Sequence, residues 1–421
     1  MVIQPIVNNG LLINQTNINS LPLPSRCDLL KLQGQINLQN INDLTLDFGG
    51  RIFIPHNGQI TSFLKIFRCS KITIRDVTFK GFNTLEEGIF HGIEVSQSTE
   101  ITLEKIQLDN IGIDGVTIAD SSRAEFNNLT IRGSGNNGIS VTDNVDGLDI
   151  LNCHIVGTKK GLHPMQKAGF GIDIEANNIQ NAGAKNIMIK HCNIIGNYSA
   201  GININKTGSP SNIKIDNCRI LYNDLGVHFE GGIGVSINDN SITSCTIANN
   251  NSCGILSSLD NTCLSINDCK VGSNGQDNIK IVANTGKKIT IEKNFISEAG
   301  QNNISLDNNL LTLVQVNFNI KDNFIKDARI GIEISALQDV NLDKNIFSSC
   351  LFAINLRNKN GLLSRDIKLL DNLFDLNNVS IFGEVDSQNS LFLNNSMTTT
   401  GGELKLKDQM LQSLIISFVT V

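Results

Sequence analysis

Apolar and polar residues alternate over short segments along most of this chain, and turns containing Asn or Gly separate the segments. Segments such as HGIEV, DGVTI, NGISV and FGIDIE share a Gly followed by an alternating apolar stretch. The copies are centred on Gly92, Gly115, Gly138, Gly171, Gly201, Gly226, Gly254, Asn278, Asn303, Gly331 and Ala353. They lie 22 to 33 residues apart. A period of two predicts β-strands, and no helical period competes with it.

A second motif follows the same spacing and reads apolar-x-apolar, two variable residues, apolar, as in ITIRDVTF, IMIKHCNI and FNIKDNFI. One of its columns contains Asp76, Lys105, Asn128, Cys153, Cys192, Cys218, Cys245, Cys269, Asn294, Asn323, Asn345 and Asn372. Two or three strands per repeat, repeated about a dozen times, predict a solenoid. We therefore expect an all-β solenoid of about 12–13 coils, with Ile, Val and Leu inside and with ladders of stacked Asn side chains.

The cysteines of that column alternate with Asn at one structural position. A free Cys behaves as a small buried apolar residue, so packing explains the column better than chemistry does. No CxxC pair is present to indicate a zinc site. We expect no metal in this column.

Composition and charge narrow the class of protein. The chain has 421 residues, with 57 Asn, 36 Gly and no Trp, and its formal net charge is −6. The charge, and the lack of a Lys/Arg cluster, argue against a nucleic-acid-binding protein. No apolar run reaches the roughly 18 residues of a membrane span. The N-terminus shows no recognisable signal peptide. We predict an arm or cap over 1–27, the solenoid over 28–402, and a cap or subunit contact over 403–421.

Candidate chemistry lies on the outer face of the coils. In FGIDIE the apolar Ile172 and Ile174 point inward, so Asp173 and Glu175 point outward. The outward column after Gly-Ile contains Glu94, Thr117, Ser140, Asp173, Asn203, His228, Leu256, Lys280, Ser305, Glu333 and Asn355. Polar groups gather in three consecutive coils, as Asp173/Glu175, Asn203/Asn205 and His228/Glu230. We expect the isolated Glu94 and Glu333 only to solvate the face.

The longest step in the repeat, 33 residues, precedes Gly171 and contains GTKKGLHPMQKAGFG. It supplies Lys159, Lys160, His163 and Lys167 beside the acids. Loops on a rigid scaffold often carry function, so this insertion is the most site-like loop of the chain.

Three chemistries fit such a patch. A pair of carboxyl groups drawn from Asp173, Glu175 and Glu230 suits glycoside hydrolysis. A lyase or epimerase acting on a uronic acid needs a base, for which His228 is a candidate, and cations for the substrate carboxylate, which the lysines supply. An acid pair with two Asn residues also suits Ca²⁺. No cofactor is required by the first two.

The repeat spelling over about residues 28–400 resembles the right-handed parallel β-helix of the pectate-lyase-like superfamily, and the handedness comes from this resemblance. FGIDIE is similar to the YGFDPHE strand of mannuronan C5-epimerases. Asp173 matches the Asp of that strand, but Phe170 stands where the family has Tyr and Glu175 where it has His. This departure speaks against epimerization. GIDIE also occurs in many β-helix proteins of phage tailspikes and bacterial surface polysaccharide enzymes.

The leading hypothesis is a glycoside hydrolase or polysaccharide lyase acting on a surface or capsular polysaccharide. Asp173, Glu175, His228 and Glu230 are its predicted catalytic residues. The predicted substrate-binding residues are Asn203, Asn205, Lys159, Lys160, His163 and Lys167. The alternative is a non-catalytic carbohydrate-binding or structural rod of a virion or cell surface. The resemblance to tailspikes implies a virion or cell-surface location and a homotrimer.

Overall fold

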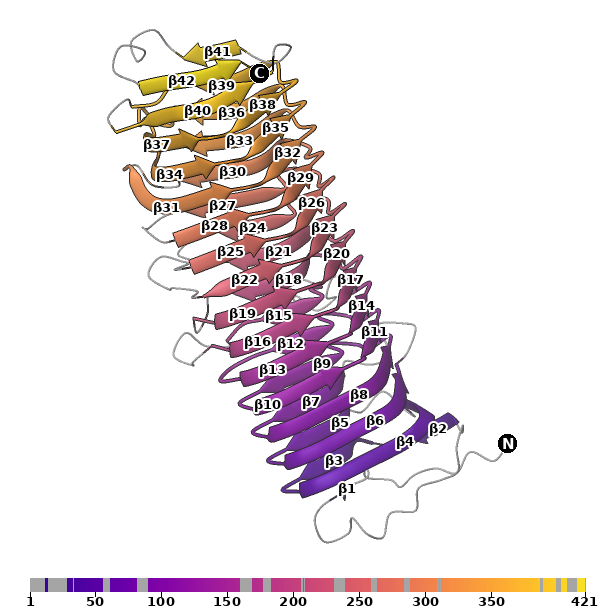
Figure 1. Ribbon diagram of the computed structural model, residues 1–421. Helices are drawn as coiled ribbons and strands as arrows, with labels where there is room; N and C mark the ends of the chain where they lie inside the picture. Colours follow the sequence, from indigo (N-terminus) through magenta and orange to yellow (C-terminus); the bar gives the residue numbers. More distant parts are fainter. Residues whose placement is uncertain are drawn as a thin grey trace. The chain divides into compact units, whose positions relative to one another are not determined.

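The structure is a computed structural model in which every element of the described residues is a β-strand (Figure 1). It describes residues 29–398 except 33, 56–60, 82–89, 160–168, 177–182, 206, 208, 231–238, 259–262, 284–287, 309, 311 and 387–388. Residues 12–13, 29–31, 403–406 and 415–420, all in strands, are described by their backbone alone. The chain divides into two compact units, Met1–Lys214 and Ile215–Val421, and the boundary falls inside one strand, β19 (Ser211–Asp216).

The first unit is a parallel stack of coils in which each strand pairs with the strand one coil away. One sheet, here called the front sheet, contains β1 (Leu12–Ile13), β3 (Ile36–Gln39), β5 (Ser62–Phe67), β7 (His91–Ser96), β9 (Val116–Ala119), β12 (Ile139–Val141), β15 (Ile172–Ile174) and β18 (Ala200–Asn205). The remaining strands, up to the boundary strand, are β2 (Leu29–Leu32), β4 (Asn42–Pro55), β6 (Ser70–Lys80), β8 (Thr99–Asp109), β10 (Ser122–Asn127), β11 (Thr130–Arg132), β13 (Asp146–Leu151), β14 (His154–Val156), β16 (Lys185–Lys190) and β17 (Asn193–Ile195).

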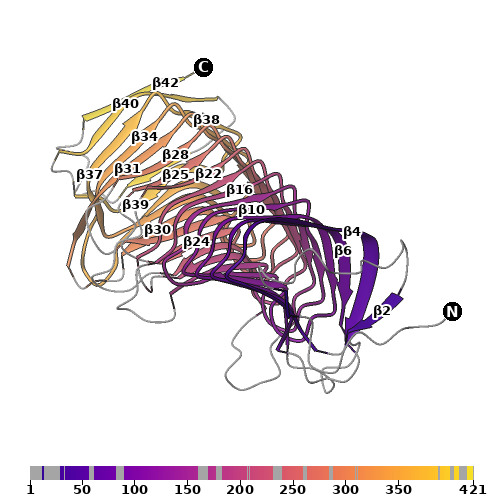
Figure 2. The same ribbon diagram turned by 90° about the horizontal axis from the view of Figure 1, so that it is seen from below.

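The second unit repeats this arrangement. Its front-sheet strands are β21 (Leu225–Glu230), β24 (Ile255–Ser258), β27 (Ile279–Ala283), β30 (Asn302–Asn308), β33 (Ile330–Ser335), β36 (Phe352–Arg357), β39 (Val379–Gly383) and β41 (Glu403–Leu406). The longer strands of the other faces are β22 (Asn240–Thr243), β25 (Cys263–Asn267), β28 (Lys288–Glu292), β31 (Val314–Lys321), β34 (Leu337–Asp343), β37 (Arg365–Leu370), β40 (Leu391–Met397) and β42 (Ile415–Thr420). The short ones are β20 (Arg219–Leu221), β23 (Thr246–Ala248), β26 (Lys270–Gly272), β29 (Phe295–Ser297), β32 (Phe324–Lys326), β35 (Ile346–Ser348) and β38 (Leu373–Asp375). Figure 2 shows β24, β30 and β39 on the opposite side of this unit from β28, β31 and β34.

The all-β solenoid predicted from the sequence is thus confirmed. The inward residues of each strand are almost fully buried, as with Ile172 and Ile174 in the first unit and Ile332 and Ile334 in the second. The predicted divisions at residues 27 and 402 stay predictions, because few residues beyond them are described.

From Cys153 onward the column that mixes Cys with Asn fills one stacked and buried position in each unit. The first three members predicted for it, Asp76, Lys105 and Asn128, do not belong: they are exposed residues with positive φ, and the apolar residue after each of them occupies the buried position.

All nine cysteines that the structure describes are free thiols. Cys245 belongs to this column as expected, because the backbone N–H of Cys218 points to its Sγ at 3.4 Å. From Asn294 the column becomes a ladder in which Nδ2 of one Asn donates to Oδ1 of the next. The steps to Asn323, Asn345, Asn372 and Asn395 measure 2.9, 2.9, 3.1 and 3.0 Å.

The turns place a residue with positive φ at the same point of successive coils. Lys293, Asp322, Lys344 and Asp371 have φ between 53° and 57°. Asn and Asp tolerate this left-handed region better than most residues, which explains part of the Asn content. Among the residues that the structure describes, no helix is long and apolar enough to cross a membrane.

Candidate functional site

The strand register confirms the outward columns expected from the sequence, within each unit. In the first unit Glu94 pairs with Thr117, Thr117 with Ser140, Ser140 with Asp173, and Asp173 with Asn203. In the second unit the chain of pairs runs His228, Leu256, Lys280, Ser305, Glu333 and Asn355. The repeat spelling therefore fixes which side chains share a face.

Asp173 is outward on β15, but it is closed off from solvent. The residue is only 3% exposed. Its Oδ1 accepts a hydrogen bond from Nδ2 of Asn203 at 2.9 Å, and its Oδ2 accepts one from Nδ2 of Asn137 at 3.4 Å. Two amides thus hold the carboxylate from opposite sides. The structure brings together Asp173 and Asn203 as predicted, and it adds Asn137, which the sequence did not indicate.

Glu175 and Asn205 lie two residues further along their coils and are half-buried. The backbone N–H of Glu175 bonds to the carbonyl of Val141 at 3.0 Å. Oδ1 of Asn205 accepts hydrogen bonds from the N–H and the hydroxyl of Thr207, at 3.1 and 3.0 Å. This amide therefore caps its own turn.

His228 and Glu230 lie on β21, in the second unit, and both are half-buried. Burial lowers the pKa of His228, and the nearby Glu230 carboxylate partly opposes that effect. A lowered pKa favours the neutral imidazole at neutral pH, which is the form that accepts a proton. The predicted three-coil patch stays a prediction, because its acids belong to the first unit and this pair to the second.

The predicted basic loop is only partly described. Lys159 is exposed, and its backbone N–H bonds to the carbonyl of Ser134 at 2.9 Å. Lys160, His163 and Lys167 lie outside the described residues. Among the described residues there is no cluster of three His, Cys, Asp or Glu that could hold a metal. The Ca²⁺ role stays a prediction.

A cluster of His91, Glu94, Asp114 and Lys65 lies on the first unit, and the sequence did not predict it. Nδ1 of His91 lies 3.3 Å from Oδ2 of Asp114, and its Nε2 lies 3.9 Å from Oε1 of Glu94. Asp114 is almost buried and accepts the backbone N–H of Asn137 at 2.9 Å. Lys65 lies 3.5 Å from Glu94 on the other side. These contacts show that Glu94 is not an isolated solvating residue.

A groove of about 950 Å³ opens on the front sheet of the second unit. Its floor and walls include the polar residues Gln301, Asn302, Arg329, Glu333, Asn355, Arg357, Asn358 and Glu384, and the aromatic residues Phe352 and Phe382. The two rings lie 5.1 Å apart between centroids, and Phe382 is 41% exposed. An apolar platform therefore lies beside a row of hydrogen-bonding groups.

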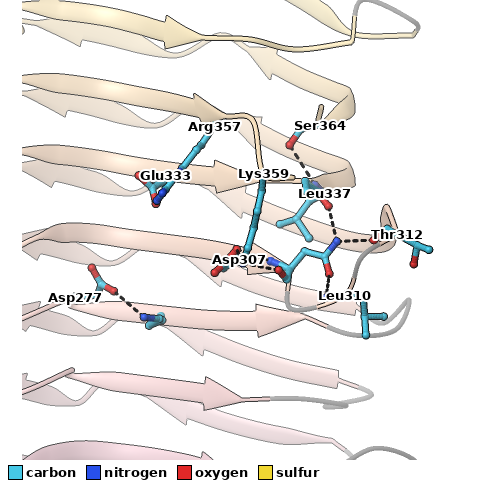
Figure 3. Close-up of polar contacts among 12 residues, drawn as sticks. Asp277, Asp307, Leu310, Thr312, Glu333, Leu337, Arg357, Lys359 and Ser364 are labelled. Atoms are coloured by element: carbon cyan, nitrogen blue, oxygen red, sulfur yellow. Dashed lines mark hydrogen bonds and ion pairs between the residues drawn. The ribbon is translucent and has the colours of Figure 1, made fainter. Parts of the chain in front are cut away.

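Glu333, on β33, lines this groove, and Figure 3 shows it beside Arg357. Its Oε2 accepts a hydrogen bond from Nδ2 of Asn355 at 3.0 Å, and its Oε1 lies 3.6 Å from Nη1 of Arg357. The Glu333 side chain is 14% exposed and that of Arg357 is 64% exposed. The carboxylate is therefore fixed in direction while one side of it remains open to the groove.

The groove is also braced from the neighbouring coils. Nζ of Lys359 reaches Oδ1 of Asp307 and the carbonyl of Asn308, both at 2.6 Å (Figure 3). These contacts tie the turn after β36 to the end of β30. Oδ1 of Asp277 accepts the backbone N–H and the Nδ2 of Asn302 at 3.1 and 2.9 Å. The groove-lining Asn302 is therefore held by a buried carboxyl group, whose pKa is raised by burial.

Sequence reasoning placed Glu333 on the face but treated it as a solvating residue. A signal was present, because the column after Gly-Ile places Asn355 one coil away and the column two residues on contains Arg357. Phe352 and Phe382 gave no comparable signal. Phe352 stands at the start of β36 and pairs with Val379, whereas Phe382 stands in the outward column of β39 and pairs with Asn355. Their rings meet diagonally across the two strands, a contact that the column spacing does not predict.

Comparisons with known proteins support the fold. The family model for the right-handed β-helix region matches residues 57–218 and 91–262. No curated protein matches the chain closely enough to count as a relative. Among solved structures, the Dettilon tailspike protein is 14% identical with a TM-score of 0.53, and the alignment covers 82% of this chain. This chain spans 63% of the tailspike's length.

Two further structures align with lower scores. The periplasmic alginate epimerase AlgG is 12% identical over 86% of this chain and 82% of its own, with a TM-score of 0.49. Pectate lyase Pel9A is 12% identical over 69% of this chain and 70% of its own, with a TM-score of 0.45. These two likenesses carry no argument about this chain, and that to the tailspike protein bears on the fold alone.

Proposed function

We propose that this chain, a parallel β-solenoid whose residues 57–262 match the right-handed β-helix model, binds a polysaccharide in the groove of its second unit. The observation that carries the proposal is one open groove that combines an aromatic pair, Phe382 exposed and Phe352 half-buried, with a carboxylate held in place. Its volume of about 950 Å³ lies near the upper end of the range for small-molecule sites.

A sugar ring has an apolar face of C–H groups and a rim of hydroxyls. The rings of Phe352 and Phe382 offer a surface for the apolar face. Glu333 and the amides of Asn302 and Asn355 offer acceptors and donors for hydroxyls at fixed positions. Because these groups lie on strands rather than loops, they need little ordering when a ligand binds.

The charges in the groove restrict the class of polysaccharide. Two arginines, Arg329 and Arg357, and two glutamates, Glu333 and Glu384, line it, so their formal charges cancel. A strongly anionic chain would meet no net attraction there. The groove therefore favours a neutral or zwitterionic polysaccharide over a polyanion.

The finer proposal is that the protein also cleaves the polysaccharide, as a hydrolase or a lyase, with Asp173, Glu175, His228 and Glu230 as catalytic residues. The lowered pKa of His228 supports a role as a base. The 3% exposure of Asp173 favours the groove over Asp173 as the place where the sugar chain is first held. A virion or cell-surface location belongs to the same proposal. A homotrimer stays the expectation that the tailspike resemblance implies, and sedimentation of the full chain decides between it and a contact of two copies.

Binding is tested by titrating neutral, zwitterionic and acidic polysaccharides into the full chain by calorimetry. We expect Phe382→Ala to weaken binding of the preferred polysaccharide about tenfold, because the loss of one stacked ring costs about 1 to 2 kcal/mol. Tyr222→Ala is the matched control, since Tyr222 is an exposed aromatic residue of the same unit that does not line the groove. Equal affinity in both variants, or binding by neither variant nor wild type, would overturn the proposal.

Cleavage is tested on the polysaccharide that binds. A shortened chain with a new reducing end indicates a hydrolase, and an unsaturated, ultraviolet-absorbing product indicates a lyase. We expect His228→Gln to lower turnover and to remove an acidic limb from the pH–rate profile. Turnover unchanged in His228→Gln and in Asp173→Asn would exclude the catalytic assignment. Binding without any product would instead support the non-catalytic alternative.

A further inference from the structure

The short strands of the second unit carry an apolar stripe on their outer side. Phe295 on β29 pairs with Phe324 on β32, Phe324 with Ile346 on β35, and Ile346 with Leu373 on β38. The two phenylalanine centroids lie 5.5 Å apart. Ile346 is 38% exposed, and the other three residues are half-buried.

The stripe is a local departure from the repeat. The same outward position carries Arg219, Thr246 and Lys270 in the three preceding coils of this unit. Lys270 is exposed, and its Nζ lies 5.9 Å from the Phe295 centroid. Four consecutive apolar residues on an otherwise polar face form a patch of the kind that marks an interaction site.

A row of alternating charges runs beside the stripe. Lys293, Asp322, Lys344 and Asp371 each precede a stripe residue by two positions, and all four are exposed. Each backbone N–H in the row bonds to a carbonyl of the next coil, at 2.9 to 3.1 Å. The spacing of the charges is therefore fixed by the stacking of the coils. No described side chain forms an ion pair with Asp322 or Lys344.

This pattern is complementary to itself when reversed. Consider a two-fold axis that passes between Phe324 and Ile346 and lies in the plane of contact, perpendicular to the stripe. It brings two copies together with their coils stacked in opposite directions. The apolar stripe of one copy then faces the stripe of the other, and the charged row faces the charged row. Phe324 then meets Ile346 of the other copy, and Phe295 meets Leu373. In the charged row, Asp322 of one copy faces Lys344 of the other, and Lys293 faces Asp371. The two charges of each pair are opposite in sign.

We propose that the apolar stripe is an antiparallel, isologous contact between two copies of this chain. Symmetric dimers require a surface that is complementary to itself, and both the stripe and the charged row meet that condition about one axis. The stripe spans about 14 Å along the stack, three coil spacings. That is small beside the roughly 800 Å² per partner of a standard interface. We therefore expect a weak dimer that forms with rising concentration.

Sedimentation velocity of the full chain over a range of concentrations tests the proposal. In Lys344→Asp the residue faces Asp322 of the other copy with like charge, twice per dimer, and we expect the dissociation constant to rise about tenfold or more. In the double variant Asp322→Lys with Lys344→Asp the opposite signs return, and we expect the wild-type dissociation constant to return with them. Lys368→Asp, an exposed reversal on β37, is the control and should leave the dimer unchanged.

Each of these residues is exposed, and the positive-φ positions already carry both Lys and Asp, so folding should be retained. A circular dichroism melt checks this for each variant. A chain that is monomeric at every concentration, or trimeric, overturns the proposal. A double variant that dimerises as weakly as Lys344→Asp also overturns the proposal. In that case the apolar patch would hold the copies together without the predicted pairing of Asp322 with Lys344.

Discussion

The outer face at Asp173 in the first unit and the outer face at Glu333 in the second are built from the same position of the repeat. In both units this position follows Gly-Ile on a front-sheet strand. Yet Asp173 is 3% exposed and held by two asparagine amides, whereas Glu333 faces a groove of about 950 Å³. One carboxylate serves the local packing, and the other remains available to a ligand.

The difference lies in the neighbours rather than in the strand. Asp173 is short and has Asn203 in the adjacent coil and Asn137 nearby, so the amides satisfy both of its oxygens. Glu333 is longer, and its neighbours Asn355 and Arg357 hold it from one side. In a solenoid, the repeat determines whether a side chain points inward or outward. The individual residues of adjacent coils determine whether an outward side chain is accessible to a ligand.

The largest effect is expected from Asp173→Ala. Removing this acceptor leaves two amide groups of a buried site without their partner. We expect the free energy of unfolding of the first unit to fall by about 2 to 4 kcal/mol. Chemical denaturation measures it. Asp173→Asn is the control, because its amide oxygen retains one acceptor. A loss below about 1 kcal/mol for the alanine variant would mean that the closed face is not built on this carboxylate.

A smaller effect, visible through pH, is expected from Asp277→Asn beside the groove. Burial raises the pKa of Asp277 in the folded protein above the ordinary value of 3.8. Its favourable contribution is therefore complete below pH 3.8 and is lost as the pH rises through the folded pKa. The asparagine variant should match wild type at low pH and become more stable than wild type above that range. Denaturation across a pH series measures the difference in free energy of unfolding between the variant and wild type. A difference that grows toward low pH would contradict a raised pKa for Asp277.

The smallest effect on stability is expected from Glu333→Ala. The side chain pairs with a largely exposed arginine, and exposed ion pairs contribute at most about 1 kcal/mol. We expect the melting temperature to change little while affinity for a bound polysaccharide falls. A stability loss as large as that of Asp173→Ala would show that the two faces differ less than their exposure indicates.

Most of the fold was predictable from the sequence. The alternation of apolar and polar residues in segments such as FGIDIE identified strands, and the regular spacing of these segments identified coils. Coils can stack only if each one places apolar residues at the same inward positions, so the sequence pattern must repeat. The alternation of Cys and Asn likewise identified a buried column, which Cys245 and Asn294 confirm. These features are local or periodic, and a single sequence displays both.

The candidate site was harder to predict because burial is not periodic. Asp173 and Glu333 have nearly the same sequence context, GIDIE and GIEIS, and opposite surroundings. The sequence favoured the long insertion before Gly171, whereas the open groove lies where the coils are 28 and 22 residues long. Phe352 and Phe382 meet only across a strand pair, a contact between residues 30 positions apart.

The asparagine ladder of the second unit also constrains how such a chain can evolve or be redesigned. From Asn294 to Asn372 each amide donates one N–H to the asparagine of the following coil, and the series ends at the acceptor Asn395, so each of these rungs needs an acceptor supplied by the coil that follows it. A coil can be duplicated or removed there only as a whole unit that brings its own asparagine in register. Lengthening by anything less would leave a donor without its acceptor in the core, so changes in length should occur in complete repeats.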